Sequence, residues 1–216
     1  MRILYHHRTQ GRGAEGNHIV SIVTALRGLG HEVQVLSPPG VDPFDPARSV
    51  PVDKSRTTTR GWERIWKWMS RHLPNWAFEL AELAFNVPAY LRLRRTLSGG
   101  RFDLVYERYA FFLLAGALAS RKAGCRFLLE ANEVSGVPLR ARPQSFVRLC
   151  AFLERLLIRR STCVHAVSSY LGERLISRGL EPERLVVMPN GFDRSRLQIY
   201  TSRREVRERL DAIAAT

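Results

Sequence analysis

MRILYHHRTQGRGAEG, residues 1–16, opens the chain with a short apolar strand and a glycine-rich loop. A helix follows, because Ile19, Val23 and Leu26 recur at the helical period. Glycines let backbone N–H groups come close to a phosphate, and the dipole at a helix N-terminus favours the negative charge of that phosphate. The stretch therefore predicts an α/β unit whose loop holds a phosphate-bearing ligand. The loop residues in this prediction are Gly11, Arg12, Gly13 and Gly16.

The same GxGxxG pattern is typical of dinucleotide-binding folds, but two details oppose such a site here. In those folds the strand turns almost directly into the first glycine, whereas here residues 6–10 intervene. Those folds also place an acidic residue after the second strand, where this chain has Leu36-Ser37-Pro38-Pro39. In a further alternative, the glycines bind no ligand and merely permit a turn. We favour the phosphate site over both alternatives.

Short apolar runs alternate with helical patterns along the chain. Most of the runs are continuously apolar, as expected for strands buried on both faces of a parallel sheet. The alternation predicts a Rossmann-like, doubly wound α/β fold, with a mainly parallel sheet and helices on both faces. The predicted strands are Arg2–His6, Glu32–Leu36, Asp103–Tyr106, Arg126–Glu130, Thr162–Val167 and Leu185–Met188.

Two segments break the alternation. Residues 37–60 are rich in proline and predict a loop region, with a short strand near 50–52. Residues 61–97 predict a long helical insertion that is interrupted at Pro74 and kinked at Pro88. A basic helix with tryptophans on one face can lie in a membrane interface, and the alternative is an insertion that packs on its own domain or on another. The membrane-facing candidates are Trp62, Trp66 and Trp76.

The composition is globular but strongly basic. The 216 residues are 45% hydrophobic and carry a formal net charge of +14, almost wholly from arginine. Such a charge favours an anionic partner, namely nucleic acid, acidic lipid or a phosphorylated substrate, unless it reflects only an arginine-biased proteome. The chain shows no helix-turn-helix, zinc-finger or RRM-like signature, so we do not expect nucleic acid as the partner.

Three cysteines, Cys125, Cys150 and Cys163, are scattered in apolar runs without metal-ligand spacing. They predict reduced core residues and no metal site. The N-terminus has no signal-peptide pattern, and no apolar stretch reaches the length of a membrane span. We therefore expect a cytoplasmic protein.

Five motifs, taken in order, resemble the N-terminal domain of the family 4 glycosyltransferases, which have the two-domain GT-B architecture. The glycine loop resembles the opening of that family only in part, because Gly13-Ala14-Glu15 alone matches. The more specific signals are the stretch GHEV at residues 30–33 and the stretch MPNGFD at residues 188–193. The other two are the strand-like runs FDLVYE at residues 102–107 and VHAVS at residues 164–168.

The resemblance implies half of an enzyme. In that family, a second Rossmann-like domain with a paired-glutamate motif holds most of the nucleotide-sugar donor. The sequence ends soon after Asp193, so residues 1–193 are expected to form the acceptor-side domain and residues 194–216 a linker or terminal helix. Catalytic residues are therefore unknown and expected in a missing donor domain. The chain would be a fragment, a split gene product or a degenerate relative.

The implied activity is that of a retaining glycosyltransferase of the hexosyltransferase type, inactive as this chain alone. It would transfer a sugar to a glycan or lipid-linked acceptor in polysaccharide or cell-envelope biosynthesis, with no cofactor and with a nucleotide sugar as donor substrate. Such an enzyme would be peripheral at the inner face of a membrane. The alternative is a non-catalytic Rossmann-like module that binds a sugar phosphate or a partner chain.

Polar residues follow the predicted strands, and ligands of such sheets bind beyond the carboxyl ends of the strands. Carboxylates and imidazoles suit sugar hydroxyls, and Arg8, Arg12 and Arg108 suit a phosphate. His165 lies inside an apolar strand and is expected to be a satisfied core histidine. Asn190 and Asp193 are expected to face the second domain. The acceptor-binding candidates are His6, His7, Arg8, Glu107, Arg108, Glu130, Asn132 and Glu133.

Overall fold

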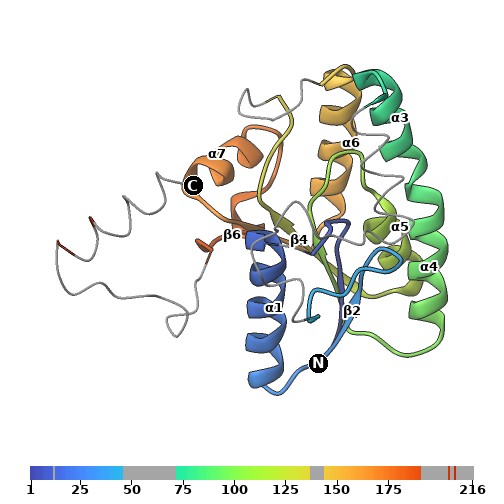
Figure 1. Cartoon of the computed structure of the whole chain (residues 1–216), viewed down its shortest axis with the longest axis vertical. Helices are drawn as coiled ribbons and strands as arrows, with labels where there is room; N and C mark the ends of the chain where they lie inside the picture. Colours follow the sequence, from blue (N-terminus) through green and yellow to red (C-terminus); the bar gives the residue numbers. More distant parts are fainter. Residues whose placement is uncertain (12, 46–71, 137–143, 191–203, 205–206, 208–216) are drawn as a thin grey trace.

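The computed structural model of the chain describes residues 1–11, 13–45, 72–136, 144–190, 204 and 207. A six-stranded sheet in the order β2-β1-β3-β4-β5-β6 forms its centre, and all neighbouring strands run parallel (Figure 1). The predicted Rossmann-like α/β fold is confirmed. The strands are β1 (Arg2–His6), β2 (Glu32–Leu36), β3 (Leu104–Arg108), β4 (Arg126–Ala131), β5 (Cys163–Ala166) and β6 (Leu185–Val187).

Helices cover both faces of the sheet. Alternate residues of β1 show this, because Ile3 and Tyr5 pack with Ile19 of α1 while Leu4 packs with Leu93 of α4. Helices α3 to α6 lie together on the face opposite α1 (Figure 1). The helices are α1 (Gly13–Gly28), α3 (Asn75–Ala84), α4 (Asn86–Ser98), α5 (Ala115–Ala123), α6 (Val147–Arg160), α7 (Ser169–Ile176) and the short 3₁₀ helix η2 (Pro182–Arg184).

Strand β3 differs most from its predicted bounds. The sequence predicts residues 103–106, whereas the strand continues through Glu107 and Arg108. Both side chains are buried, with Glu107 beside His6 of β1 and Arg108 beside Glu130 of β4. Charged residues normally mark the end of a buried strand, but here partners on the neighbouring strands compensate their charges.

The helical insertion breaks at a different place from the one predicted. The interruption at Pro74 is confirmed, since this residue is the N-cap of α3. The kink predicted at Pro88 is wrong: α3 and α4 meet at Phe85, and Pro88 lies in the first turn of α4, where its missing N–H is not needed. Residues 46–71, which include Trp62, Trp66 and the predicted short strand, lie outside the described residues.

Asn86 fixes the junction of α3 and α4. Its amide nitrogen donates to the carbonyl oxygens of Leu83 at 2.9 Å and Phe112 at 2.7 Å, and its Oδ1 accepts from the N–H of Leu114 at 2.7 Å. One side chain therefore satisfies backbone groups on both sides of the break. It also ties the junction to the loop that leads into α5.

The three cysteines are free, with Cys150 buried and the other two half-buried. Burial raises the pKa of the Cys125 thiol and of the Cys163 thiol. Cys150 is the core residue that the sequence predicts, whereas Cys125 and Cys163 are only partly enclosed. Among the described residues, no helix is both long and apolar enough to cross a bilayer.

A carboxylate from α3 caps α6. The two oxygens of Glu79, which is 3% exposed, accept from the N–H groups of Ser145 and Phe146, both at 2.7 Å. The N-cap residue of α6, Phe146, has no side-chain acceptor of its own. Glu79 therefore supplies the capping acceptor from another helix, at the end where the helix dipole favours negative charge.

We predict that Glu79→Ala lowers the free energy of unfolding by about 2 kcal/mol or more. The substitution removes the cap of α6 and leaves two N–H groups without their acceptor. Urea unfolding measures the difference. Glu173→Ala, at an exposed position of α7, is the control and is expected to change stability by less than about 0.5 kcal/mol. Equal losses in both variants would contradict a capping role.

Candidate functional site

Polar residues gather where the parallel strands end. In the register of the sheet, His6 neighbours Glu107, and Glu130 lies between Arg108 and His165. Successive side chains of a strand point to opposite faces. The predicted acceptor-binding residues are therefore divided by the sheet: His6 and Glu107 lie on the α5 side, and Arg108 and Glu130 on the α1 side.

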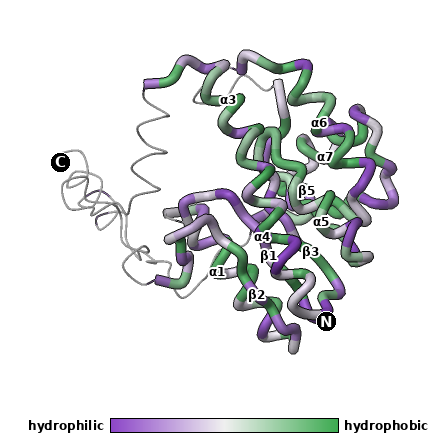
Figure 2. The backbone as a smooth tube through the Cα atoms, turned by 90° about the vertical axis from the view of Figure 1, so that its right-hand side faces the viewer, coloured by the Kyte–Doolittle hydropathy of each residue, from purple (hydrophilic) through white to green (hydrophobic). Residues whose placement is uncertain are grey.

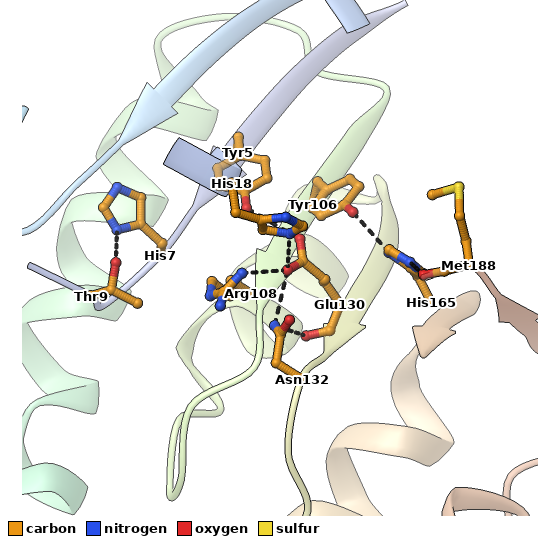
Figure 3. Close-up of polar contacts among 10 residues, drawn as sticks. All are labelled: Tyr5, His7, Thr9, His18, Tyr106, Arg108, Glu130, Asn132, His165 and Met188. Carbon is orange, nitrogen blue, oxygen red and sulfur yellow. Dashed lines mark hydrogen bonds and ion pairs between the residues drawn. The ribbon is translucent and has the colours of Figure 1, made fainter. Parts of the chain in front are cut away.

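Glu130 is the centre of the group on the α1 side (Figure 3). Its Oε1 accepts from Arg108 at 2.6 Å, from His18 Nε2 at 2.9 Å and from Asn132 Nδ2 at 2.9 Å. Its Oε2 accepts from the hydroxyl of Tyr5 at 3.2 Å. We call these five residues, Tyr5, His18, Arg108, Glu130 and Asn132, the Glu130 cluster.

Glu130 is ionised although it is fully buried. Burial alone would raise its pKa, but the hydrogen bond from His18 and the positive charge of Arg108 outweigh burial and lower the pKa to about 2. Burial, together with the negative charge of Glu130, raises the pKa of Tyr5 and of Tyr106. The two tyrosines therefore stay protonated at neutral pH, and the fixed charges of the cluster are the Glu130 carboxylate and the Arg108 guanidinium that faces it.

His18 is a member that the sequence analysis missed. It lies in α1 just after the glycine loop, and its Nε2 faces the ionised carboxylate. Because a carboxylate only accepts hydrogen bonds, Nε2 carries the proton. Its place in the first turns of the helix, after a glycine-rich loop, was the one feature of the sequence that could have pointed to it. Its partner, Glu130, is more than a hundred residues away.

His165 is satisfied on both ring nitrogens (Figure 3). Its Nδ1 lies 3.2 Å from the hydroxyl of Tyr106 and its Nε2 lies 2.8 Å from the carbonyl oxygen of Met188. With 4% of its surface exposed, it is the core histidine that the sequence predicts. It ties β5 to β3 and to the end of β6.

On the α5 side, His6 and Glu107 form an ion-pair-like contact of 2.5 Å between Nδ1 and Oε2. Glu107 is fully buried, and its Oε1 has no hydrogen-bond partner within the described part of the chain. The carboxylate fits only because residue 116 is glycine, since a Cβ there would overlap it. Helix α5 is thus adapted to the pair.

His7 is buried and connects two loops. Its Nε2 lies 2.9 Å from Ser37 Oγ, after β2, and its Nδ1 lies 3.3 Å from Thr9 Oγ1, which accepts from the N–H of Gly11. Burial, aided by the neighbouring His6, lowers the pKa of His7 to about 3. His7 is therefore neutral at physiological pH, and it helps to position the glycine loop.

The glycine loop closes tightly on the start of α1. Gly11 and Gly13 have φ of +63° and +58°, which glycine adopts without strain. Gly16 lies in the helix, and a Cβ there would overlap the carbonyl group of Gly11. Two glycines are thus required by the turn and the third by close packing. No contact with a phosphate is part of this geometry, so the phosphate site remains a prediction.

The arginines predicted to bind phosphate have carboxylate partners. Arg8 pairs with Glu82 of α3 at 2.6 Å, and Arg108 pairs with Glu130. Glu133 and Asn190 are exposed, as is Trp76 at the start of α3, with 53% of its surface accessible. Arg12 and Asp193 lie outside the described residues. Within the described ranges, no three His, Cys, Asp or Glu side chains gather as metal ligands.

We predict that Gly116→Ala lowers the free energy of unfolding by about 1–3 kcal/mol, because the added methyl group displaces the buried Glu107 carboxylate. Chemical unfolding measures the change. Gly28→Ala is the matched control, since it is also a helical glycine and its Cβ would meet no atom within 4 Å. That variant is expected to be neutral or slightly stabilising. A neutral Gly116→Ala would show that the pair tolerates the methyl group.

We predict a pH-dependent stability contribution from His7. Its pKa is about 3 in the fold against an ordinary 6.5, so the unfolded chain binds the proton first. As the pH falls from 6.5 towards 3, wild type therefore loses up to about 1.4 kcal/mol per pH unit. The stability advantage of wild type over His7→Gln should shrink between pH 7 and pH 4.5 in urea titrations. His31→Gln is the control, and an equal pH dependence for both variants would refute the prediction.

The fold is similar to one half of several larger sugar-nucleotide proteins of known structure. Anabaena Alr3699/HepE in complex with UDP superposes with a TM-score of 0.54 at 16% identity, over 98% of this chain and 50% of that one. The lipopolysaccharide outer core galactosyltransferase WaaB gives 0.54 at 13% identity, over 95% and 50%. UDP-GlcNAc 2-epimerase from Neisseria meningitidis, bound to UDP-GlcNAc, gives 0.53 at 14%, over 87% and 46%.

At these identities the likeness concerns the fold, and the chain spans about half the length of the structures that it matches. Among curated protein sequences, none matches it. The sequence does match a family model, that of the glycosyl transferase 4-like domain, over residues 13–191. Because this match covers most of the sequence, the chain belongs to the glycosyl transferase 4-like domain family.

Proposed function

We propose that the chain is the acceptor-binding half of a retaining glycosyltransferase of the hexosyltransferase type. A second domain would hold most of the nucleotide-sugar donor and supply the catalytic carboxylates. The acceptor would be a glycan or a lipid-linked sugar of polysaccharide or cell-envelope biosynthesis. Family membership supports the glycosyltransferase class, and the hydrogen-bonding groups at the carboxyl ends of the strands support a sugar ligand.

One observation carries the acceptor role. Asn132 donates to Glu130, yet its Oδ1 is buried and has no hydrogen-bond partner within the described part of the chain. A buried acceptor without a donor is costly, and a sugar hydroxyl would supply that donor. The ionised Glu130 beside it fixes the amide orientation, because its Oε1 binds the NH₂ group of Asn132.

The phosphate groups of a donor would meet the backbone N–H groups of the glycine loop rather than Arg8 or Arg108. Arg8 and Arg108 are engaged by carboxylates, whereas the glycine loop lies at the N-terminus of α1, where the dipole favours an anion. We therefore assign the loop, Gly11 to Gly16, to the donor diphosphate or to a phosphate of the acceptor. UDP and UDP-glucose are ligands of structurally similar HepE, which fits a nucleotide-sugar donor.

The second candidate is a non-catalytic module that binds a sugar phosphate or a partner chain with the same edge of the sheet. The ion pairs of Arg8 and Arg108 with buried carboxylates favour this candidate. A site whose charges already balance one another can be purely structural. In either case we place the protein in the cytoplasm, peripheral at the inner face of a membrane, and expect no cofactor.

We predict that the purified 216-residue chain binds glycan acceptors but transfers no sugar. Saturation-transfer NMR with an oligosaccharide panel measures binding, and mass spectrometry with UDP-glucose and UDP-N-acetylglucosamine measures transfer. Asn132→Ala should weaken glycan binding about tenfold, the loss of one hydrogen bond of about 1.4 kcal/mol. Gln34→Ala, which removes an exposed amide from β2, should leave binding unchanged.

The outcomes separate the candidates. Sugar transfer by the chain alone would overturn its assignment as half of an enzyme. Binding of glucose 1-phosphate without binding of any glycan would favour the non-catalytic module. Glycan binding that is insensitive to Asn132→Ala would place the acceptor away from the Glu130 cluster.

A further inference from the structure

Helices α3, α4, α5 and α6 form one layer on the sheet face opposite α1 (Figures 1 and 2). The structure describes all four helices in full. Their outer surface carries large apolar side chains that the fold leaves in solvent, including Val87 at 64% and Phe152 at 54% exposed. Large exposed apolar side chains that gather on one face mark interaction surfaces in soluble proteins. The exposed apolar residues are Trp76, Leu80, Val87, Leu91, Leu118, Val147, Leu149 and Phe152.

All exposed charges of these four helices are positive, whereas α7, which packs into the same core, carries the exposed Glu173. The four helices contain three acidic residues, Glu79, Glu82 and Glu154, and all three are buried. Each is turned inward to a partner: Glu79 caps α6, Glu82 pairs with Arg8, and Glu154 pairs with Arg178. The exposed basic residues of the helices are Arg94, Arg95, Arg121, Lys122, Arg148, Arg155 and Arg159.

Apolar and basic side chains share helical faces. In α4, Val87, Leu91 and Arg94 follow one another at intervals of four and three residues, and in α5 Leu118 precedes Arg121 by three. Between these two helices lies a hollow of about 430 Å³ lined by Tyr90, Leu118, Arg121 and Lys122. An apolar wall next to two cations matches the glycerol region and phosphate of an anionic lipid.

We infer that this layer, which we call the α3–α6 face, docks on a bilayer containing anionic phospholipid. The apolar side chains enter the boundary between headgroups and acyl chains, and the basic ones meet lipid phosphates. The apolar side chains decide for lipid over nucleic acid: both are anionic and attract the arginines, but only a bilayer would bury the exposed Trp76, Val87 and Phe152.

The orientation follows from the helix directions. The apolar residues of α4 and α6 lie in the first halves of those helices, at the edge of the sheet where the strands end. Docking by this end brings that edge of the sheet towards the membrane, whereas the Glu130 cluster lies on the other face of the sheet, the α1 side. The orientation rests on the proposed function, because its purpose is to meet a lipid-linked acceptor. The docking itself needs no sugar.

Vesicle flotation of the full 216-residue chain tests the inference. We expect binding to phosphatidylcholine vesicles with 30 mol% phosphatidylglycerol, and at least tenfold weaker binding to pure phosphatidylcholine. Leu91→Ser/Arg121→Gln should weaken binding to the anionic vesicles about tenfold. Leu29→Ser/Arg126→Gln is the matched control, because it also removes one exposed apolar side chain and one exposed positive charge, but outside the four helices.

Equal losses in the two double variants, or no preference for anionic vesicles, would overturn the inference. Circular dichroism melting confirms that both variants are folded, and Val87→Ser/Lys122→Gln replaces the first variant if it is not. A 20-nucleotide DNA that binds with the same sensitivity to Leu91→Ser/Arg121→Gln, while vesicles do not, would assign the face to nucleic acid. Vesicle binding together with failure to bind any glycan would refute the proposed function and leave the docking face intact.

Discussion

A buried, ionised carboxylate at the end of β4 holds the polar edge of the sheet together. Glu130 joins β1 through Tyr5, β3 through Arg108 and α1 through His18. Removing a charge from water is costly unless hydrogen bonds and an opposite charge replace the solvent, and Glu130 has both. Glu130 therefore helps to fix the position of α1, and with it the glycine loop. In open parallel sheets, ligands bind beyond the carboxyl ends of the strands, which is the edge that Glu130 occupies.

Buried carboxylates with partners distant in sequence also hold the helical layer together. Glu79, Glu82 and Glu154 are all buried, and each joins its own helix to a segment distant in sequence. Glu154 shows the pattern well: it accepts from the hydroxyl of Tyr109 at 2.7 Å and from the N–H of Ser135 at 2.8 Å, and it pairs with Arg178. The acids of these helices thus act inside the domain, and the exposed charges of α3 to α6 are all basic.

The sequence was sufficient for the class of fold but not for the partners in the site. Continuous apolar runs predicted all six strands, since a parallel sheet covered on both faces requires them. The burial of Glu107 and Arg108 was not predictable, because it depends on His6 and Glu130 in neighbouring strands. His18 and Glu82 were missed for the same reason: their partners are distant in sequence, and no local period reveals them. The phosphate and acceptor contacts remain predictions.

The alternation of Glu107 and Arg108 along β3 has a consequence for folding. A slip of β3 by one residue would turn each side chain to the other face of the sheet. A slip that brings Glu107 to the place of Arg108 would set it beside Glu130, so that two carboxylates would be buried together without a cation. Mispaired sheets are therefore penalised electrostatically, and the polar edge selects one strand register.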